Sequence, residues 1–361
     1  MADGDNQHLE FMRLLMITRK VDKNDPLAGF AYDWVFKIGQ AVDELRVIAW
    51  QKGDISDLPE NIKVFNLTKK SKIGRIMEFK KLVFKNIRKI DGLFCHMNPE
   101  YTILAAPIAK LFSRKVVSWY AHKAVNWKLY LVNLLTDKIL TASEESCRLK
   151  NRKKIEVAGH GINVDKFKVQ SSKLKVKNSK FKILSIGRIS PIKDYETLIK
   201  AVDILVKDSP PAGGLEVQII GGPGLKEHKT YFKNLKKMVS GNNLGNYIKF
   251  IGPVPHREIQ FYYENCDLFI NLSQTGSVDK SVLEAMACEK IVLTSNEAFV
   301  NILNNNLMVE ENNPKFLTEK IKWVMNLDKE AKKQIQEKLR AEVVKNHNLD
   351  NLVVKIIEQF K

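Results

Sequence analysis

The sequence predicts an α/β protein made of two doubly wound domains. Short apolar runs alternate with helical segments along the chain, which is the pattern of parallel sheets covered on both faces. A polar stretch rich in Lys and Ser, at 169–179, divides this alternation into two series. The chain has 361 residues, of which 44% are hydrophobic, and this length suits two cores better than one.

The first series contains seven candidate strands. They lie at 13–17, 44–49, 62–66, 92–96, 116–119, 138–141 and 155–157. We therefore expect an N-terminal Rossmann-like domain over residues 1–168, followed by a linker at 169–179.

The second series contains five candidate strands. They lie at 181–186, 216–220, 248–251, 268–271 and 291–294. We expect a second Rossmann-like domain over 180–345. The last residues, 346–361, have the apolar spacing of a helix, and we expect this helix to pack back on the N-terminal domain.

Several protein classes are disfavoured by composition. No apolar run approaches the length needed to cross a bilayer, and the segment 1–8 is polar and unlike a signal peptide, so we expect a cytoplasmic protein. The four cysteines are far apart and form neither a metal-binding pattern nor a disulfide framework. We interpret them as reduced packing residues and expect no metal.

The net charge of +18 is unevenly distributed. Residues 1–170 hold 30 basic against 19 acidic side chains, and residues 171–361 hold 29 against 22. The segment Lys69–Lys89 alone has nine basic residues and one acid, Glu78, with apolar residues at helical spacing. Two interpretations stay open for this predicted helix: it lies on an anionic membrane surface, or it is a core-facing helix with a solvated charged side.

Two segments of the second series indicate a nucleotide site. Arg188 and Lys193 directly follow the apolar run 181–186. Ligands of open α/β sheets bind beyond the carboxyl ends of the strands, so cations there suit a phosphate or diphosphate. Further on, Glu284 belongs to a helical segment that precedes the candidate strand 291–294.

These segments resemble those of the retaining glycosyltransferases of family 4, which have the GT-B fold. The resemblance is carried by order and spacing in 183–193, 196–201, 217–221, 250–252, 267–270 and 283–287, and more thinly by 119–122 and 158–163. It covers nearly the whole chain and implies two Rossmann-like domains that face each other across a cleft.

The resemblance implies roles for the second-domain residues. Arg188 and Lys193, in the motif that begins at Gly187, would hold the donor diphosphate and stabilise the charge that accumulates when the glycosidic bond breaks. Glu284 would accept hydrogen bonds from the ribose hydroxyls. Backbone amides near Gly276 and Ser277 would contact the phosphates, so no metal or cofactor is expected.

Two first-domain residues match the family more weakly. His122, after the strand 116–119, corresponds to a cleft histidine that contacts the transferred sugar, although a loop-capping histidine would look the same. Gly29, in the loop after the first strand, resembles a glycine turn that lets the backbone approach donor and acceptor. An ordinary turn is the alternative.

The chain departs from the family in its Glu-x7-Glu motif. Glu284 is the second glutamate, but Gly276 occupies the position of the first, which faces the sugar in that family. Donor-sugar identity and turnover are therefore in doubt. Asp279 is either a partial substitute or a helix N-cap, and we interpret it as the cap. Asp194 replaces a glycine and is expected to cap the helix 195–206 with little consequence.

The function that combines most of these features is a retaining glycosyltransferase. It would move a sugar from a UDP- or GDP-sugar to a glycan or lipid-linked acceptor, in cell-surface polysaccharide or glycoconjugate synthesis, peripheral on the cytoplasmic membrane face. A catalytically weakened relative that binds nucleotide-sugar or glycan is the alternative. A nucleic-acid-binding protein is less favoured, because no recognition motif accompanies the basic charge.

Overall fold

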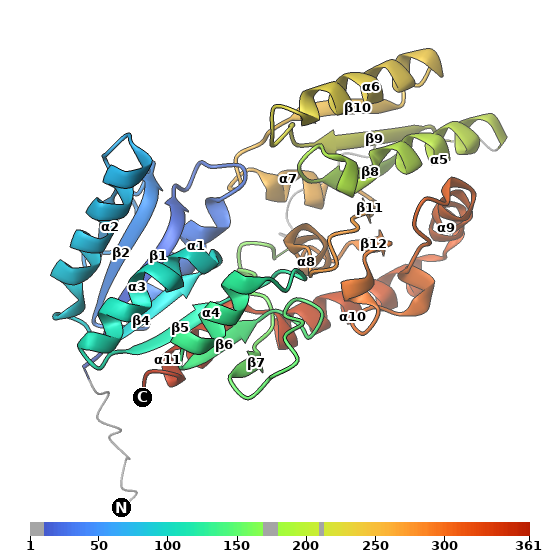
Figure 1. Ribbon diagram of the computed structural model, residues 1–361. Helices are drawn as coiled ribbons and strands as arrows, with labels where there is room; N and C mark the ends of the chain where they lie inside the picture. The colour runs from blue at the N-terminus through green and yellow to red at the C-terminus, as the bar shows by residue number, and fades with distance from the viewer. Residues whose placement is uncertain (1–10, 169–179, 209–212) are drawn as a thin grey trace, which may run out of the picture.

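The computed structural model describes residues 11–168, 180–208 and 213–361, which form two parallel sheets (Figure 1). The segment 169–179, predicted as the linker, lies outside the described residues. Each of the twelve predicted strands is present, and most bounds agree within one residue. The α/β prediction is therefore confirmed. The main difference is the first strand, which continues to Val21.

The first sheet has seven strands in the order β3-β2-β1-β4-β5-β6-β7. Its strands are β1 (Arg13–Val21), β2 (Glu44–Lys52), β3 (Ile62–Asn66), β4 (Gly92–His96), β5 (Lys115–Trp119), β6 (Lys138–Thr141) and β7 (Ile155–Val157). Its helices are α1 (Gly29–Gln40), α2 (Lys72–Ile87), α3 (Pro99–Leu111) and α4 (Trp127–Leu135).

The second sheet has five strands in the order β10-β9-β8-β11-β12. Its strands are β8 (Phe181–Ile186), β9 (Leu215–Ile220), β10 (Ile248–Gly252), β11 (Leu268–Asn271) and β12 (Ile291–Thr294). The helices of this half are α5 (Tyr195–Asp208), α6 (His228–Gly241), α7 (Ile259–Glu264), α8 (Lys280–Ala287), α9 (Pro314–Asn326) and α10 (Lys329–Asn346), with 3-10 turns η1 (Pro191–Lys193), η2 (Glu297–Phe299) and η3 (Asn305–Leu307).

Strand β1 shows why its apolar run is unbroken. Successive side chains of a strand point to opposite faces, and both faces of this sheet are covered. Leu14 and Met16 pack in the core that includes residues of α1, whereas Leu15 and Ile17 pack in the core that includes residues of α2 and α3. Because all of them are buried, the strand needs apolar residues at every position.

The last helix, α11 (Leu349–Glu358), belongs to the first half of the molecule in space (Figure 1). The backbone of Ile162 donates to His347 O and accepts from Leu349 N, which ties the end of α10 and the start of α11 to the segment after β7. Helix α11 then packs against α1. The chain therefore crosses between the two halves twice.

The strand order places one topological switch point in each sheet. Strand β1 lies between β2 and β4, and β8 lies between β9 and β11. The crossover connections on the two sides of such a strand run in opposite directions, which leaves a crevice at the carboxyl end. In the second sheet this crevice lies between the ends of β8 and β11, where Arg188 and Ser273 follow their strands.

Candidate active site

Arg188 stands at the switch point of the second sheet. Its exposed guanidinium forms neither a hydrogen bond nor an ion pair with any described residue. The preceding Gly187 lies so close to Gly221 that a Cβ on Gly221 would be 1.9 Å from Gly187 O, and Gly221 has a φ of +139°. The glycine at 221 thus allows the loop after β9 to contact the loop after β8, which carries Arg188.

Lys193, expected to hold the donor diphosphate, is paired with an acid of the protein in this structure. Its side chain is 9% exposed, and Nζ donates to Ser273 Oγ at 3.0 Å and to Asp279 Oδ1 at 2.7 Å. Asp279 is at the N-cap position of α8 as predicted, but its carboxylate makes no capping bond. It bonds Lys193 and Asn296 instead, which fixes the loop before α8 against η1.

The capping role predicted for Asp194 is confirmed. Its Oδ1 accepts from Thr197 N at 3.2 Å in the first turn of α5. Asp194 has a φ of +43°, a left-handed conformation that aspartate tolerates better than most residues. This conformation explains how an aspartate stands where the family often has a glycine.

Glu284 is buried within α8, and both carboxylate oxygens are bonded. Oε1 lies 3.0 Å from His256 Nε2, and Oε2 accepts from the Tyr263 hydroxyl at 2.9 Å. Burial alone would raise the pKa of Glu284, but His256 and Tyr263 together hold it below the ordinary value. The group is therefore a carboxylate, and each oxygen keeps a second lone pair for a further donor.

A chain of contacts links Glu284 to the first half of the molecule. Lys166 Nζ lies 3.0 Å from His256 Nδ1 and 3.2 Å from Asp33 Oδ2. Because an ammonium only donates, His256 Nδ1 is the acceptor, so Nε2–H donates to Glu284. The histidine ring thus has one tautomer, and Asp33 on α1 is connected to the carboxylate of α8.

Gly29 lies directly against this chain of contacts. A Cβ built on Gly29 would be 2.6 Å from the Cβ of His256, which belongs to the other half of the molecule. The predicted glycine turn therefore allows a close approach between the two halves at the start of α1. A side chain at 29 would displace His256 and disturb its bond with Glu284.

His122 follows β5 and its ring is exposed. Its Nδ1 accepts from Ala124 N at 3.0 Å, so the neutral ring carries its proton on Nε2. Partial burial, Lys123 and Arg188, in that order, lower the pKa of His122. Arg188 is thus near enough, although it belongs to the other half of the molecule, to act electrostatically on His122.

Gly276 shows what replaces the missing acid of the Glu-x7-Glu motif. The residue is buried with a φ of +58°, and a Cβ there would be 2.6 Å from Lys123 Cδ and 2.4 Å from Glu297 Oε1. Lys123 Nζ donates to Gln274 O at 3.0 Å, and Glu297 is paired with Arg148 at 2.7 Å. Two charged side chains therefore fill the space beside the glycine.

Ser277, expected to offer its backbone amide to phosphate, lies between Gly276 and the start of α8. Its carbonyl accepts from Asn296 Nδ2 at 2.9 Å, which anchors the loop to the end of β12. The same amide group of Asn296 also bonds Asp279. The loop before α8 is thus held on both sides by one asparagine.

Sequence reasoning missed His256, Tyr263, Lys166 and Lys123. One signal was available for His256, because it follows β10 and therefore lies at the same sheet edge as Arg188. The others carry no local signal. Tyr263 and Lys166 come from a helix and a connecting segment whose path depends on the tertiary fold.

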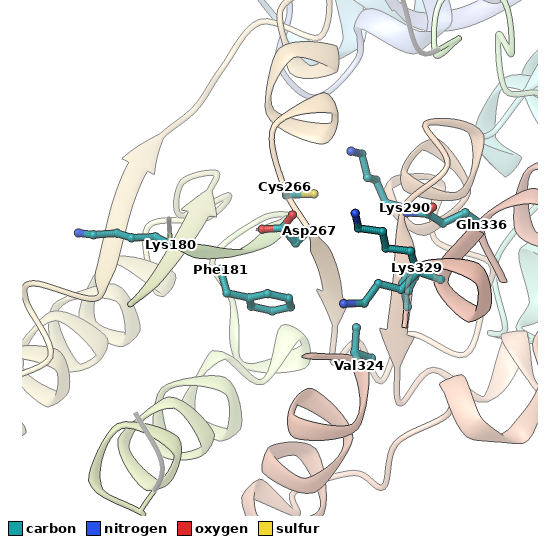
Figure 2. Close-up of a pocket in the computed structure, with 10 residues that line it drawn as sticks. Lys180, Phe181, Cys266, Asp267, Lys290, Val324, Lys329 and Gln336 are labelled. Carbon is teal, nitrogen blue, oxygen red and sulfur yellow. The ribbon is translucent and has the colours of Figure 1, made fainter. Parts of the chain in front are cut away.

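A cavity of about 430 Å³ lies away from these residues (Figure 2). It is at the opposite edge of the second sheet, where Phe181, Asp267 and Lys290 stand at the amino ends of strands. Four of its ten lining residues are lysines, but Lys290 donates to Glu264 O and Lys332 to Met325 O. Figure 2 shows Lys180 pointing away from the other ammonium groups. This cavity is separate from the candidate site.

Three buried histidines make stability depend on pH. Burial first, and then the charge of Lys280, lowers the pKa of His96 and His160 well below 6.5, and burial and Lys355 lower that of His347 to about 4. The folded state keeps these rings neutral, whereas the unfolded chain protonates them below about pH 6.5.

We therefore expect the free energy of unfolding to be greatest above pH 6.5. It should fall by about 1.4 kcal/mol per pH unit for each histidine below that value, because the unfolded state binds more protons. Urea unfolding at pH 7.5, 6.5 and 5.5 measures this. In the matched H347N variant the free energy of unfolding should change less with pH. If the wild type is equally stable at all three pH values, the buried histidines are not held neutral in the folded state.

Comparison with known proteins identifies relatives. Residues 138–341, more than half of the chain, match the family described as glycosyl transferases group 1. An uncharacterized glycosyltransferase of Haemophilus influenzae is 26% identical over 64% of this chain and 62% of its own length. A D-inositol 3-phosphate glycosyltransferase of Frankia alni is 26% identical over 37% of this chain and 34% of its own length. In both cases the aligned segment covers less than two thirds of the relative's own length.

Solved structures share the fold over nearly the whole chain. Anabaena Alr3699/HepE, crystallised with UDP and glucose, has a TM-score of 0.79, 17% identity, and coverage of 96% of this chain and 98% of its own. A glycosyltransferase of Rickettsia africae has a TM-score of 0.77, 20% identity and 98% coverage of both chains. The predicted GT-B fold is confirmed.

Proposed function

Because the chain belongs to the glycosyl transferases group 1, we propose that it moves a sugar from a nucleotide-sugar to an acceptor with retention of the anomeric configuration. The observation that carries this proposal is the position of Arg188. Its exposed guanidinium has no anionic partner in the described part of the chain and stands at the switch point of the second sheet, where buried Glu284 belongs to helix α8. A diphosphate and a ribose are the ligand groups that suit these two charges.

In the proposed reaction the glycosidic bond breaks and negative charge accumulates on the leaving diphosphate. Arg188 stabilises this charge, and Lys193 contributes from η1 when a phosphate oxygen competes with Asp279 for its ammonium. Glu284 accepts from the ribose hydroxyls with its remaining lone pairs. His122 presents Nε2–H toward the transferred sugar. The acceptor hydroxyl oxygen bonds to the anomeric carbon on the face that the diphosphate leaves, and its proton passes to the leaving phosphate.

The donor base is proposed to be uracil or guanine. One structural neighbour, Anabaena Alr3699/HepE, was crystallised with UDP-glucose, which favours testing UDP-sugars first. A thermal-shift series with UDP, GDP, UDP-glucose and GDP-mannose distinguishes the bases. A ligand at about 100 times its Kd stabilises the native state by about 2.7 kcal/mol. A rise in Tm with one base supports the proposal, and no rise with any nucleotide contradicts it.

Gly276 gives a second candidate function some support. Without the acid of the Glu-x7-Glu motif, the chain would bind a nucleotide-sugar but transfer its sugar to an acceptor slowly. Nucleotide release in the presence of a glycan acceptor distinguishes the two functions. Binding together with steady release indicates the transferase, whereas binding without release indicates the weakened relative.

We further propose that α2, α3 and α4 form a membrane-facing surface, which serves a lipid-linked acceptor at the cytoplasmic face. These helices lie in a row across one face of the first sheet (Figure 1). Helix α2 occupies the segment predicted to be an amphipathic helix: Phe79, Val83 and Ile87 are buried, whereas Ile73 and Met77, which belong to the same apolar pattern, are 75% and 68% exposed. Among the described residues, no helix has the length and apolar character to span a bilayer.

Exposed apolar side chains and basic side chains occur together on this surface. Helix α4 exposes Trp127, Tyr130 and Leu134, which share one side at helical spacing. The acid of α2, Glu78, is bonded to the backbone of Thr68 and Lys69 and forms no ion pair with the described lysines of the helix. Apolar side chains among lysines are typical of helices that lie on anionic membranes.

The test replaces Lys80, Lys81 and Lys85 by glutamine. Each lysine near an anionic surface contributes about 1 kcal/mol, so binding to phosphatidylserine vesicles should weaken by roughly a hundredfold in a sedimentation assay. The matched control replaces Lys329, Lys332 and Lys333 on α10 and should bind as the wild type does. Equal binding of the wild type to neutral and anionic vesicles would contradict the membrane proposal.

A further inference from the structure

Lys280, the first residue of α8, has no role in the site described above. Its ammonium is buried against the Phe30 ring of α1, in the other half of the molecule. Among the residues that the structure describes, Nζ has no hydrogen-bond partner. A buried ammonium without a partner is costly, so its position requires an explanation.

Neither of the nearby acids pairs with Lys280. Asp33 and Glu284 influence it electrostatically, but Asp33 is bonded to Lys166, and Glu284 is bonded to His256 and Tyr263. Burial lowers the pKa of Lys280 well below its ordinary value despite these acids. Neither carboxylate is within ion-pair distance of the ammonium, so neither neutralises it directly.

Two buried histidines share this environment with Lys280. His96 ends β4, at the switch point of the first sheet, and its Nε2 has no partner in the described part of the chain. Its Nδ1 lies 3.0 Å from Thr18 Oγ1 of β1. When the threonine hydroxyl donates, the free Nε2 carries the proton and is an available donor.

His160 contributes the second free nitrogen. It follows β7 and is 3% exposed, and its Nδ1 lacks a partner among the described residues. The Phe30 ring that Lys280 contacts also packs against the His96 ring, with 5.9 Å between the ring centroids. His160 packs against Trp119, whose ring contacts Trp34 beside His96. Three buried polar atoms, none with a partner among the described residues, thus lie around one aromatic cluster where the first sheet meets α8.

We propose that Lys280, His96 and His160 form an oxyanion-binding site that takes a phosphate group at the interface of the two halves. This inference extends the proposed function. The phosphate is either the diphosphate of the donor or a phosphate carried by the acceptor, and the chemistry of recognition is the same. Binding supplies the counter-charge that Lys280 lacks and acceptor oxygens for the imidazole N–H groups.

An anion fits this site better than a cation does. An ammonium has donors only, and it repels a metal ion that the imidazoles would otherwise coordinate. The residues that the structure describes contain no cluster of His, Cys, Asp and Glu suited to a metal. An ammonium flanked by neutral imidazoles is a donor set that suits an oxyanion.

The experiment measures the binding of UDP and of uridine by calorimetry. Binding of glucose 6-phosphate is measured in the same way in the presence of saturating UDP. The variants are K280M, which keeps the side-chain length without charge, and H96N, which keeps a partner for Thr18 and removes Nε2. The matched control is K329M, a lysine of the distant cavity in Figure 2. K280M should also be at least as stable as the wild type, because it removes a buried unpaired ammonium.

The expected loss is on the order of tenfold to a hundredfold, the value of a charge-assisted hydrogen bond. Weaker UDP binding with unchanged uridine binding assigns the site to the donor diphosphate. Weaker glucose 6-phosphate binding with unchanged UDP binding assigns it to the acceptor. If the wild type binds UDP and both variants bind UDP and glucose 6-phosphate as the wild type does, the inference is overturned. A wild type that binds no nucleotide contradicts the proposed function instead.

Discussion

Replacing Arg188 with alanine is expected to lower kcat/KM for sugar transfer by a factor of about 10² to 10³, the usual loss when a group that stabilises developing charge is removed. The guanidinium is exposed and has no partner among the described residues, so its removal leaves no buried group unsatisfied. Stability should therefore change by less than about 0.5 kcal/mol. Initial rates with purified donor, together with urea unfolding, measure both quantities.

Arg257 offers a matched control for this variant. It is an exposed arginine of the same half, and it pairs only loosely with the neighbouring Glu258. R257A should transfer sugar at the wild-type rate. If R188A retains full activity, or if both variants lose it equally, Arg188 does not stabilise the leaving group.

Replacing Glu284 with alanine is expected to remove nucleotide binding and to destabilise the fold. The variant leaves the His256 N–H without its acceptor, whereas the Tyr263 hydroxyl keeps the Ser281 carbonyl as an acceptor at 3.2 Å. An unsatisfied buried donor costs about 1–3 kcal/mol, so the free energy of unfolding should fall by about 2 kcal/mol. Urea unfolding and a UDP titration at a temperature where the variant is folded measure the two effects.

The control for this variant is E258A, which removes an exposed carboxylate just before α7. It should match the wild type in stability and in UDP binding. An E284A variant that is destabilised but binds UDP normally would show that Glu284 supports the fold and does not contact the ribose.

Most of the fold was predictable because its strands are buried on both faces. Runs such as Leu268–Asn271 and Ile291–Thr294 are apolar at three of their four positions and buried throughout, so the sequence alone indicates their bounds. The end of β1 was not predictable in the same way. Arg19 and Lys20 continue the strand at the sheet edge, where polar side chains reach solvent and other loops.

The site was predictable only where a residue follows its strand directly. Arg188 could be placed at the carboxyl edge because it comes two residues after β8. The bond between Lys193 and Asp279 could not be predicted, since it joins residues 86 positions apart through two loops. Likewise, the sequence shows that Gly276 lacks the expected acid, but only the structure shows Lys123 and Glu297 beside it.

Comparing UDP with uridine in the wild type and in R188A tests the central claim most directly. If Arg188 binds the diphosphate, the wild type binds UDP far more tightly than uridine, and R188A loses much of that difference while its uridine affinity stays unchanged. Calorimetry at constant ionic strength gives both affinities. An R188A protein that keeps the full preference for UDP over uridine would contradict the account.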